Sequence, residues 1–168
     1  RTGIGADGLL LLNKSGKYDF EMQYFNSDGK EASFCGNGGR CLAAYAYKSG
    51  IVGKKMVFQA FDGIHKAEII NENKNVFDIK LSMKDVGLIT ELDDIFLTHT
   101  GSPHAIKKVN NLENIDVFRE GRKIRNSKFF EKEGVNVNFV EINKSSIKIR
   151  TYERGVEDET FSCGTGVT

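Results

Sequence analysis

The sequence lacks long apolar segments and a strong charge of either sign. Its apolar runs, such as Leu9–Leu12, fall far short of the ~20 residues that a membrane-spanning helix needs, and the printed sequence does not open on a basic segment followed by an apolar one. Because 24 Lys and Arg residues balance 23 Asp and Glu residues, the composition does not favour binding to nucleic acid or to a membrane surface. We therefore expect a cytoplasmic protein with neither kind of partner.

The sequence also lacks the patterns of a disulfide scaffold, a pyridoxal phosphate site and a metal site. Three cysteines are an odd number without scaffold spacing, which favours a reducing compartment in which thiols can react. No lysine stands in a recognisable Schiff-base context, so removing a proton from a carbon acid would need electrostatic activation. Metal ligands occur in clusters, whereas Cys35 and Cys41 stand alone. The three histidines do not pair at ligand spacing either; they are His65, His99 and His104.

The first half of the chain alternates strand-like and helix-like patterns. Tyr18, Phe20, Met22 and Tyr24 alternate with polar residues, which predicts a half-buried strand followed by a polar turn at 26–29. Residues 41–47 carry no charge on any face, which predicts a helix over about 38–48 that is buried on all sides. Three further strand-like runs follow, at 55–61, 64–70 and 76–81.

The second half repeats this plan. We expect strands near 95–100 and 105–109, a helix near 116–130, and strands at 135–142 and 146–153. Each half thus runs from strands through a polar turn to a Cys-Gly-X-Gly element that opens a helix. The pattern predicts an α/β protein of the α+β kind with two related halves, residues 1–82 and 83–168, each wrapping its strands around a helix.

The segment Gly3–Gly8 fits the pattern G-x-G-x-x-G, which in dinucleotide-binding proteins follows a strand and opens a helix. Here it is followed by Leu9–Leu12 and then by a turn at 13–16. A short apolar run that ends in a turn is typical of a strand rather than of a helix facing a phosphate. We therefore do not expect a dinucleotide site.

Two Cys-Gly-X-Gly elements, Cys35–Gly38 and Cys163–Gly166, are the strongest functional signal. At a helix entrance, glycines expose backbone N–H groups that can hold an anion, and the positive helix end favours a thiolate. That helix end contributes about 0.3–1 kcal/mol, and one pKa unit corresponds to about 1.36 kcal/mol, so the thiol becomes a usable base near neutrality without being a permanent thiolate. Cys41 is instead expected to be a small buried hydrophobic residue.

Two such thiols suit the inversion of a stereocentre. If they lie on opposite sides of a carbon acid, one thiolate removes the proton from one face while the other thiol delivers a proton to the opposite face. A single fixed base would return the proton to the side it came from. The alternative is that both elements are glycine-rich turns with incidental cysteines, which two matching contexts disfavour.

The two elements and their neighbours resemble the active-site motifs of the diaminopimelate epimerase family. Residues 26–29 with Cys35–Cys41 resemble the first motif, and Tyr152–Gly155 with Cys163–Gly166 resemble the second. The resemblance implies cofactor-independent epimerisation of LL-2,6-diaminopimelate to meso-diaminopimelate, for lysine and peptidoglycan-precursor biosynthesis. It also implies a fold of two pseudo-symmetric domains, each a mixed β-sheet curled around a central helix, with the substrate bound between them.

Carried over by position, the resemblance makes Cys35 and Cys163 the catalytic acid/base thiols. It assigns to His104 and Glu153 the adjustment of the thiol pKa values, in opposite senses, because a cationic His lowers a neighbouring thiol's pKa and an anionic Glu raises it. Residues matching substrate-binding positions are expected to hold the two carboxylates and the distal amine; they are Asn26, Gly36, Asn37, Asn136, Glu153, Arg154, Gly164 and Thr165, with Ser102 as a weaker contact.

The resemblance covers the chain from end to end, but the family's opening strand and its closing helix and strands have no counterpart in it. We therefore expect an internal fragment that has little or no epimerase activity by itself. The thiol used for each stereoisomer, and the choice between monomer and homodimer, stay open. Two alternative functions also stay open, another amino- or imino-acid racemase of the same superfamily and a non-catalytic thiol pair in a binding or redox module.

Overall fold

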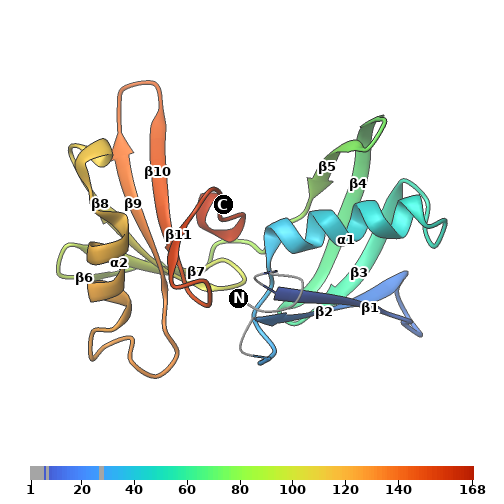
Figure 1. Ribbon diagram of the computed structural model, residues 1–168, viewed down its shortest axis with the longest axis horizontal. Coiled ribbons are helices and arrows are strands. Elements are labelled where there is room, and N and C mark those ends of the chain that lie inside the picture. Colours follow the sequence, from blue (N-terminus) through green and yellow to red (C-terminus); the bar gives the residue numbers. More distant parts are fainter. Residues whose placement is uncertain (1–5, 7, 27–28) are drawn as a thin grey trace. The chain divides into compact units, whose positions relative to one another are not determined.

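The computed structural model describes residues 6, 8–26 and 29–168. The chain forms two compact units, Arg1–Met83 and Lys84–Thr168, each built on one β-sheet (Figure 1). The turn residues Ser27 and Asp28, and most of the glycine-rich segment discussed above, namely Gly3, Ile4, Gly5 and Asp7, lie outside the described residues. Across the part of the chain that is described, no helix has both the length and the apolar character required to cross a membrane.

The first unit holds a five-stranded sheet in the order β1-β2-β3-β4-β5. All neighbouring strands are antiparallel except β2 and β3, which are parallel and are connected through helix α1. A parallel pair needs such a crossover because its two strands start at the same edge of the sheet. The elements are β1 (Gly8–Asn13), β2 (Phe20–Asn26), α1 (Gly36–Lys48), β3 (Lys55–Ala60), β4 (Gly63–Asn73) and β5 (Val76–Leu81).

The core of this unit lies between α1 and one face of the sheet (Figure 1). Phe20 and Met22 of β2 are buried, as the alternating pattern predicted, and Phe20 stacks on Phe58 of β3 with ring centroids 4.8 Å apart. Ala43 and Ala46 supply the small buried side chains on the helix. Small residues there let the helix axis approach the aromatic layer closely.

The prediction that this helix is buried on all sides is wrong. Leu42, Ala43 and Ala46 face the sheet, whereas Cys41 and Tyr45 are exposed, Tyr45 by 60% of its surface. Residues four apart share one helix face, and within this unit the sheet covers only the opposite face. Cys41 is therefore a surface residue rather than a core residue.

The second unit holds a six-stranded sheet in the order β11-β10-β9-β8-β7-β6, with β8 and β9 as its parallel pair. The crossover between β8 and β9 carries a 3₁₀ turn, η1, and helix α2, which packs on β9, β10 and β11 (Figure 1). The elements are β6 (Thr90–Leu92), β7 (Ile95–His99), β8 (Pro103–Lys108), η1 (Leu112–Asn114), α2 (Val117–Arg125), β9 (Asn136–Ile142), β10 (Ile147–Glu153), β11 (Asp158–Thr160) and η2 (Thr165–Val167).

Two mixed sheets with few helices confirm the predicted fold class. The helix expected near 116–130 is shorter than predicted, since α2 ends at Arg125 and turns occupy the residues that follow. The second Cys-Gly element leads into η2, a single 3₁₀ turn. Its counterpart in the first unit opens a full α-helix.

Gly121 of α2 packs closely against the sheet, and it provides a test of this packing. A Cβ atom at position 121 would lie 2.4 Å from the Cβ of buried Tyr152. Alanine normally stabilises a helix by about 1 kcal/mol relative to glycine, but here the clashing atom is attached to the strand backbone and cannot rotate away. We expect Gly121→Ala to lower the free energy of unfolding by about 1–3 kcal/mol, measured by urea denaturation followed by circular dichroism.

Gly53→Ala is the matched control, because position 53 has no heavy atom within 4 Å of the new Cβ and no positive φ angle. Its free energy of unfolding should stay within about 0.5 kcal/mol of that of the parent protein. A free energy of unfolding for Gly121→Ala that equals or exceeds the parent value would contradict the close packing of Gly121 on Tyr152.

Candidate functional site

The first Cys-Gly element forms the N-terminal cap of α1. Cys35 has an extended backbone, and its Sγ accepts a hydrogen bond from the N–H of Gly38 at 3.4 Å. The first helical hydrogen bond runs from the N–H of Gly39 to the Cys35 carbonyl at 2.8 Å. Both the N–H donor and the positive end of the helix favour negative charge on this sulfur.

The glycines of this element allow two apolar side chains to lie on the first turn of the helix. A Cβ at Gly38 would lie 3.0 Å from Leu10 of β1, and one at Gly39 would lie 2.9 Å from the ring of Phe34. Phe34 is buried and stacks on His65 with ring centroids 3.8 Å apart. The residue preceding Cys35 is thereby anchored in the core of the first unit.

The other predicted residues of the first unit lie on either side of Cys35 in the chain. Gly36 is the first residue of α1, and the side chain of Asn37 accepts a hydrogen bond from the guanidinium of Arg40. Asn26 ends β2, and its carbonyl accepts the N–H of Gly29 at 2.9 Å. Asn26 and Cys35 thus stand at the two ends of the connection between β2 and α1.

In the second unit, a buried hydrogen-bond network brings together most of the predicted residues. The hydroxyl of Ser102 lies 2.9 Å from Nε2 of His104 and 2.9 Å from Oγ1 of Thr165, and it accepts a hydrogen bond from Nδ2 of Asn136 at 3.1 Å. Thr165 Oγ1 lies 3.5 Å from Sγ of Cys163, which is only 6% exposed. The second candidate thiol is therefore connected to the network through Thr165.

The backbone of Arg154 holds one end of this network. Its N–H donates to Oδ1 of Asn136 at 2.8 Å, while its guanidinium donates to the carbonyl of Glu133 at 2.8 Å. Glu153, next to it in β10, accepts a hydrogen bond from the hydroxyl of Thr160 at 2.9 Å. Gly164 has helical backbone angles and precedes η2, so it belongs to the turn that carries Cys163 and Thr165.

Sequence reasoning missed Asn138, which is completely buried in β9. Its Nδ2 lies 2.8 Å from Nδ1 of His104, and its Oδ1 accepts a hydrogen bond from the hydroxyl of Thr151 at 2.9 Å. A signal was present in the sequence. Asn136 and Asn138 stand two apart in a strand that is otherwise largely apolar, so both point to the same face.

Gly166 fits against this network so closely that a side chain at this position would collide with Asn138 as it is placed here. A Cβ at this position would lie 2.6 Å from Oδ1 of Asn138, and 3.3 Å from both Sγ of Cys163 and Cε1 of His104. A glycine at the end of the Cys-Gly-X-Gly element therefore lets the turn that carries Cys163 pack closely on β8 and β9.

Burial, together with the nearby positive groups His99 and Arg154, lowers the pKa of His104 to about 4. His104 is 2% exposed, and desolvation disfavours the charged imidazolium. A neutral imidazole at neutral pH differs from the expectation that His104 acts on a thiol as a cation. His104 can influence Cys163 through hydrogen bonds but not through a net charge.

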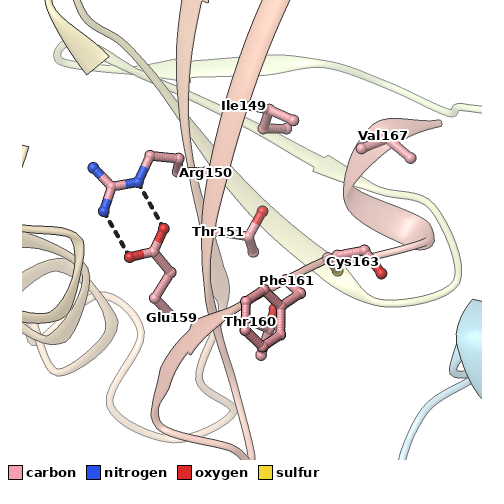
Figure 2. Close-up of a pocket in the computed structure, with 9 residues that line it drawn as sticks. Ile149, Arg150, Thr151, Glu159, Thr160, Phe161, Cys163 and Val167 are labelled. Carbon is pink, nitrogen blue, oxygen red and sulfur yellow. Dashed lines mark hydrogen bonds and ion pairs between the residues drawn. The ribbon is translucent and has the colours of Figure 1, made fainter. Parts of the chain in front are cut away.

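Cys163 also lines a cavity of about 480 Å³ beside β10 and β11 (Figure 2). Among the described residues that line this cavity, Arg150 supplies the guanidinium. This guanidinium is already paired with both carboxylate oxygens of Glu159, at 2.6 and 2.7 Å, and with two backbone carbonyls. The volume suits a small molecule, but a saturated ion pair offers little to a substrate carboxylate. The predicted substrate contacts Asn136 and Arg154 are not part of its lining, which also includes Ile149, Thr151, Thr160, Phe161, Ser162 and Val167.

Within the described residues, metal-ligating side chains do not gather at either cysteine. Over the described ranges, no group of three or more His, Cys, Asp or Glu side chains is placed to hold a metal ion. Each cysteine instead places its sulfur atom beside a group that can donate a hydrogen bond, and such sulfur atoms can act as acids or bases in proton transfer.

The low pKa of His104 makes stability depend on pH. Between about pH 6.5 and 4 the unfolded chain binds a proton at this position that the folded chain does not, so the free energy of unfolding falls as the pH falls through this window. The loss attributable to His104 should approach roughly 3 kcal/mol at pH 4. Urea denaturation from pH 7 to 4 should show this slope in the parent protein, and a smaller one in His104→Gln.

His99→Gln is the matched control, because His99 is exposed and should leave most of the slope in place. The titration of His104, followed by NMR, provides a direct check. A midpoint near 6.5 would contradict the desolvated, neutral imidazole.

Comparison with known proteins places these motifs in one family. The family model described as diaminopimelate epimerase matches residues 1–88 and 96–168. The diaminopimelate epimerase of Flavobacterium psychrophilum is 51% identical over 169 residues, which cover 100% of this chain and 64% of that protein. Those of Chlorobaculum tepidum and Aquifex aeolicus are 46% and 42% identical, covering 99% of this chain and 66% and 63% of those proteins. The chain thus spans a little less than two thirds of its relatives' length.

Solved structures with lower identity share the fold. A Bacillus anthracis phenazine biosynthesis protein of the PhzF family superposes with a TM-score of 0.69 at 15% identity, covering 98% of this chain and 64% of that one. A hydroxyproline epimerase from Agrobacterium vitis gives a TM-score of 0.64 at 16% identity, covering 95% and 57%. With the fold shared and the family model matched along nearly the whole sequence, the chain belongs to the diaminopimelate epimerase family.

Proposed function

We propose that the protein carrying this chain converts LL-2,6-diaminopimelate to meso-diaminopimelate without a cofactor, with Cys35 and Cys163 as its acid/base pair. The observation that carries the proposal is the setting of the two cysteines. Cys35 caps α1 with a backbone N–H donated to its sulfur, and Cys163 has a hydroxyl beside its sulfur, in a chain of the diaminopimelate epimerase family. One thiol in each compact unit matches the requirement for one proton-transfer group on each face of a substrate.

The proposed reaction breaks one C–H bond and forms another. A thiolate takes the proton from the α-carbon, which leaves a carbanion whose charge spreads onto the adjacent carboxylate. The second thiol then donates its proton to the opposite face and becomes a thiolate. Backbone N–H groups at Gly36–Asn37 and Gly164–Thr165 would stabilise the developing charge on the carboxylate, and each well-placed donor contributes about 2.7–4 kcal/mol.

Asn136 and Arg154 are the proposed contacts for the distal end of the substrate. The amide of Asn136 uses one N–H and one lone pair in the network, which leaves a second N–H for a ligand. The guanidinium of Arg154 is half-buried and donates to the carbonyl of Glu133, and in this proposal it also binds the distal carboxylate of the substrate. Asn26 and Glu153 complete the proposed set, with the Glu153 carboxylate beside the distal amine.

His104, Ser102 and Thr165 act on Cys163 through hydrogen bonds in this proposal. Because His104 is neutral at pH 7, it serves as a fixed donor and acceptor rather than as a cation. Catalysis by thiols also requires that they stay reduced, which is why we assign the reaction to the cytoplasm. The oligomeric state is not part of the proposal.

The decisive test is solvent deuterium incorporation at the α-carbon of diaminopimelate, measured by mass spectrometry. The assay uses the protein as its gene encodes it, including any sequence that flanks these 168 residues. We expect Cys35→Ala and Cys163→Ala each to slow incorporation by at least about 10²-fold, because a positioned acid or base contributes about 10²–10⁴. Cys41→Ala is the matched control, since this exposed cysteine shares α1 with the first element and should leave the rate unchanged.

Incorporation that survives both substitutions would overturn the two-thiol mechanism. A reversible disulfide between Cys35 and Cys163 without any proton exchange in the parent protein would favour a redox or binding module instead.

Substrate choice is tested at Arg154. Arg154→Met removes the guanidinium but keeps much of the aliphatic stem, and we expect kcat/KM for diaminopimelate to fall by about 10- to 100-fold, as for the loss of a charge-assisted hydrogen bond. Arg119→Met, on the exposed face of α2, should leave kcat/KM unchanged. Turnover of proline-like substrates that is indifferent to the Arg154 substitution would favour a different racemase of the same superfamily.

A further inference from the structure

The proton positions in the Cys163 network can be assigned from its fixed donors. The backbone N–H of Arg154 can only donate, so the atom of Asn136 that receives it is the carbonyl oxygen Oδ1. The amide nitrogen of Asn136 therefore points to Ser102 and donates to its hydroxyl oxygen. The hydroxyl proton of Ser102 is thereby available to His104 Nε2 or to Thr165.

The imidazole tautomer of His104 decides between these two. If Nε2 is an acceptor, it attracts a hydroxyl proton from Ser102 or Thr165. If Nε2 carries the proton, it donates to the same two oxygens, at 2.9 and 3.0 Å, and the Ser102 proton turns to Thr165. The Thr165 hydroxyl then directs its own proton to the sulfur of Cys163, 3.5 Å away.

Asn138 controls which tautomer forms, because its amide lies against the other ring nitrogen. Its Oδ1 accepts the Thr151 hydroxyl and faces the Cα–H of Gly166, a contact that suits an oxygen and would oppose an NH₂ group. Its Nδ2 therefore donates to Nδ1 of His104 at 2.8 Å. A nitrogen that accepts this hydrogen bond cannot carry a proton.

We propose that Asn138 is a positioning residue that holds His104 as the tautomer protonated on Nε2 and so directs the Thr165 hydroxyl proton to Cys163. A hydrogen bond donated to sulfur favours the thiolate. The assignment of the tautomer stands on the hydrogen bonds alone, whereas its catalytic consequence rests on the proposed epimerase function. The low pKa of His104 agrees with it, because an imidazolium would also carry a proton on Nδ1, where it would face the N–H donor of Asn138.

Long-range ¹H–¹⁵N correlation spectra of the isotope-labelled protein at pH 7 test the tautomer directly. We expect Nδ1 of His104 in the unprotonated range and Nε2 in the protonated range. Asn138→Asp has nearly the same shape but offers only acceptors at neutral pH, so it should move a proton onto Nδ1. The resonances of His65 and His99 serve as internal controls and should keep their tautomeric patterns.

A parent protein with the proton on Nδ1, or an Asn138→Asp protein whose Nδ1 stays unprotonated, would overturn the proposal. Thr151→Val provides a second variant in case Asn138→Asp does not fold. It preserves the shape but removes the stronger of the two contacts that orient the Asn138 amide, so the second tautomer of His104 should become detectable beside the first. A single, unchanged tautomer in Thr151→Val would also contradict the assigned role of the amide.

Deuterium exchange on diaminopimelate separates this inference from the proposed function. We expect kcat of Thr151→Val to fall by about tenfold or less, with KM nearly unchanged, because a hydrogen bond to the sulfur is weakened while substrate contacts remain. Absence of exchange in the parent protein would overturn the function and leave the tautomer assignment intact. Normal exchange in Thr151→Val with mixed tautomers would overturn the catalytic role of Asn138 alone.

Discussion

The parallel pairing of β8 with β9 determines the candidate site of the second unit. Its register sets His104 opposite Asn136 and Ile106 opposite Asn138, so that two amides and an imidazole lie on one face of adjacent strands. Ser102 immediately precedes β8, and the turn that carries Cys163 is held against the same strands by Thr165. A shift of the register by one residue would turn these side chains to the other face of the sheet.

The sulfur atoms of the two candidate thiols lie beside different kinds of hydrogen-bonding group. The sulfur of Cys35 faces a backbone N–H, which belongs to the helix itself and carries no titratable group. The sulfur of Cys163 faces a side-chain hydroxyl that belongs to a chain of exchangeable protons. The second sulfur is therefore coupled to the state of neighbouring side chains, whereas this hydrogen bond couples the first sulfur to the first turn of α1.

Much of the fold could be predicted from local patterns, because strand alternation and Gly-rich turns act over a few residues. The buried positions of Phe20 and Met22 follow directly from the period of two. The exposure of Cys41 and Tyr45 could not be predicted, since an apolar helix does not reveal how many of its faces the sheet covers. The neutral state of His104 was equally hidden, because it results from desolvation by residues distant in sequence. Of the site, the residues within motifs could be named in advance, while Asn138 required the strand pairing.

The contact between Gly166 and Asn138 links two positions that lie in different motifs. Any L-amino acid at 166 would place its Cβ 2.6 Å from the Asn138 amide oxygen, so a side chain at 166 is compatible only with a shorter residue at 138. Loss of that amide would in turn leave Nδ1 of His104 without its donor. Among relatives that keep this arrangement, the residues at positions 138 and 166 should consequently vary together. A substitution at either position would indicate a different hydrogen-bond network around His104.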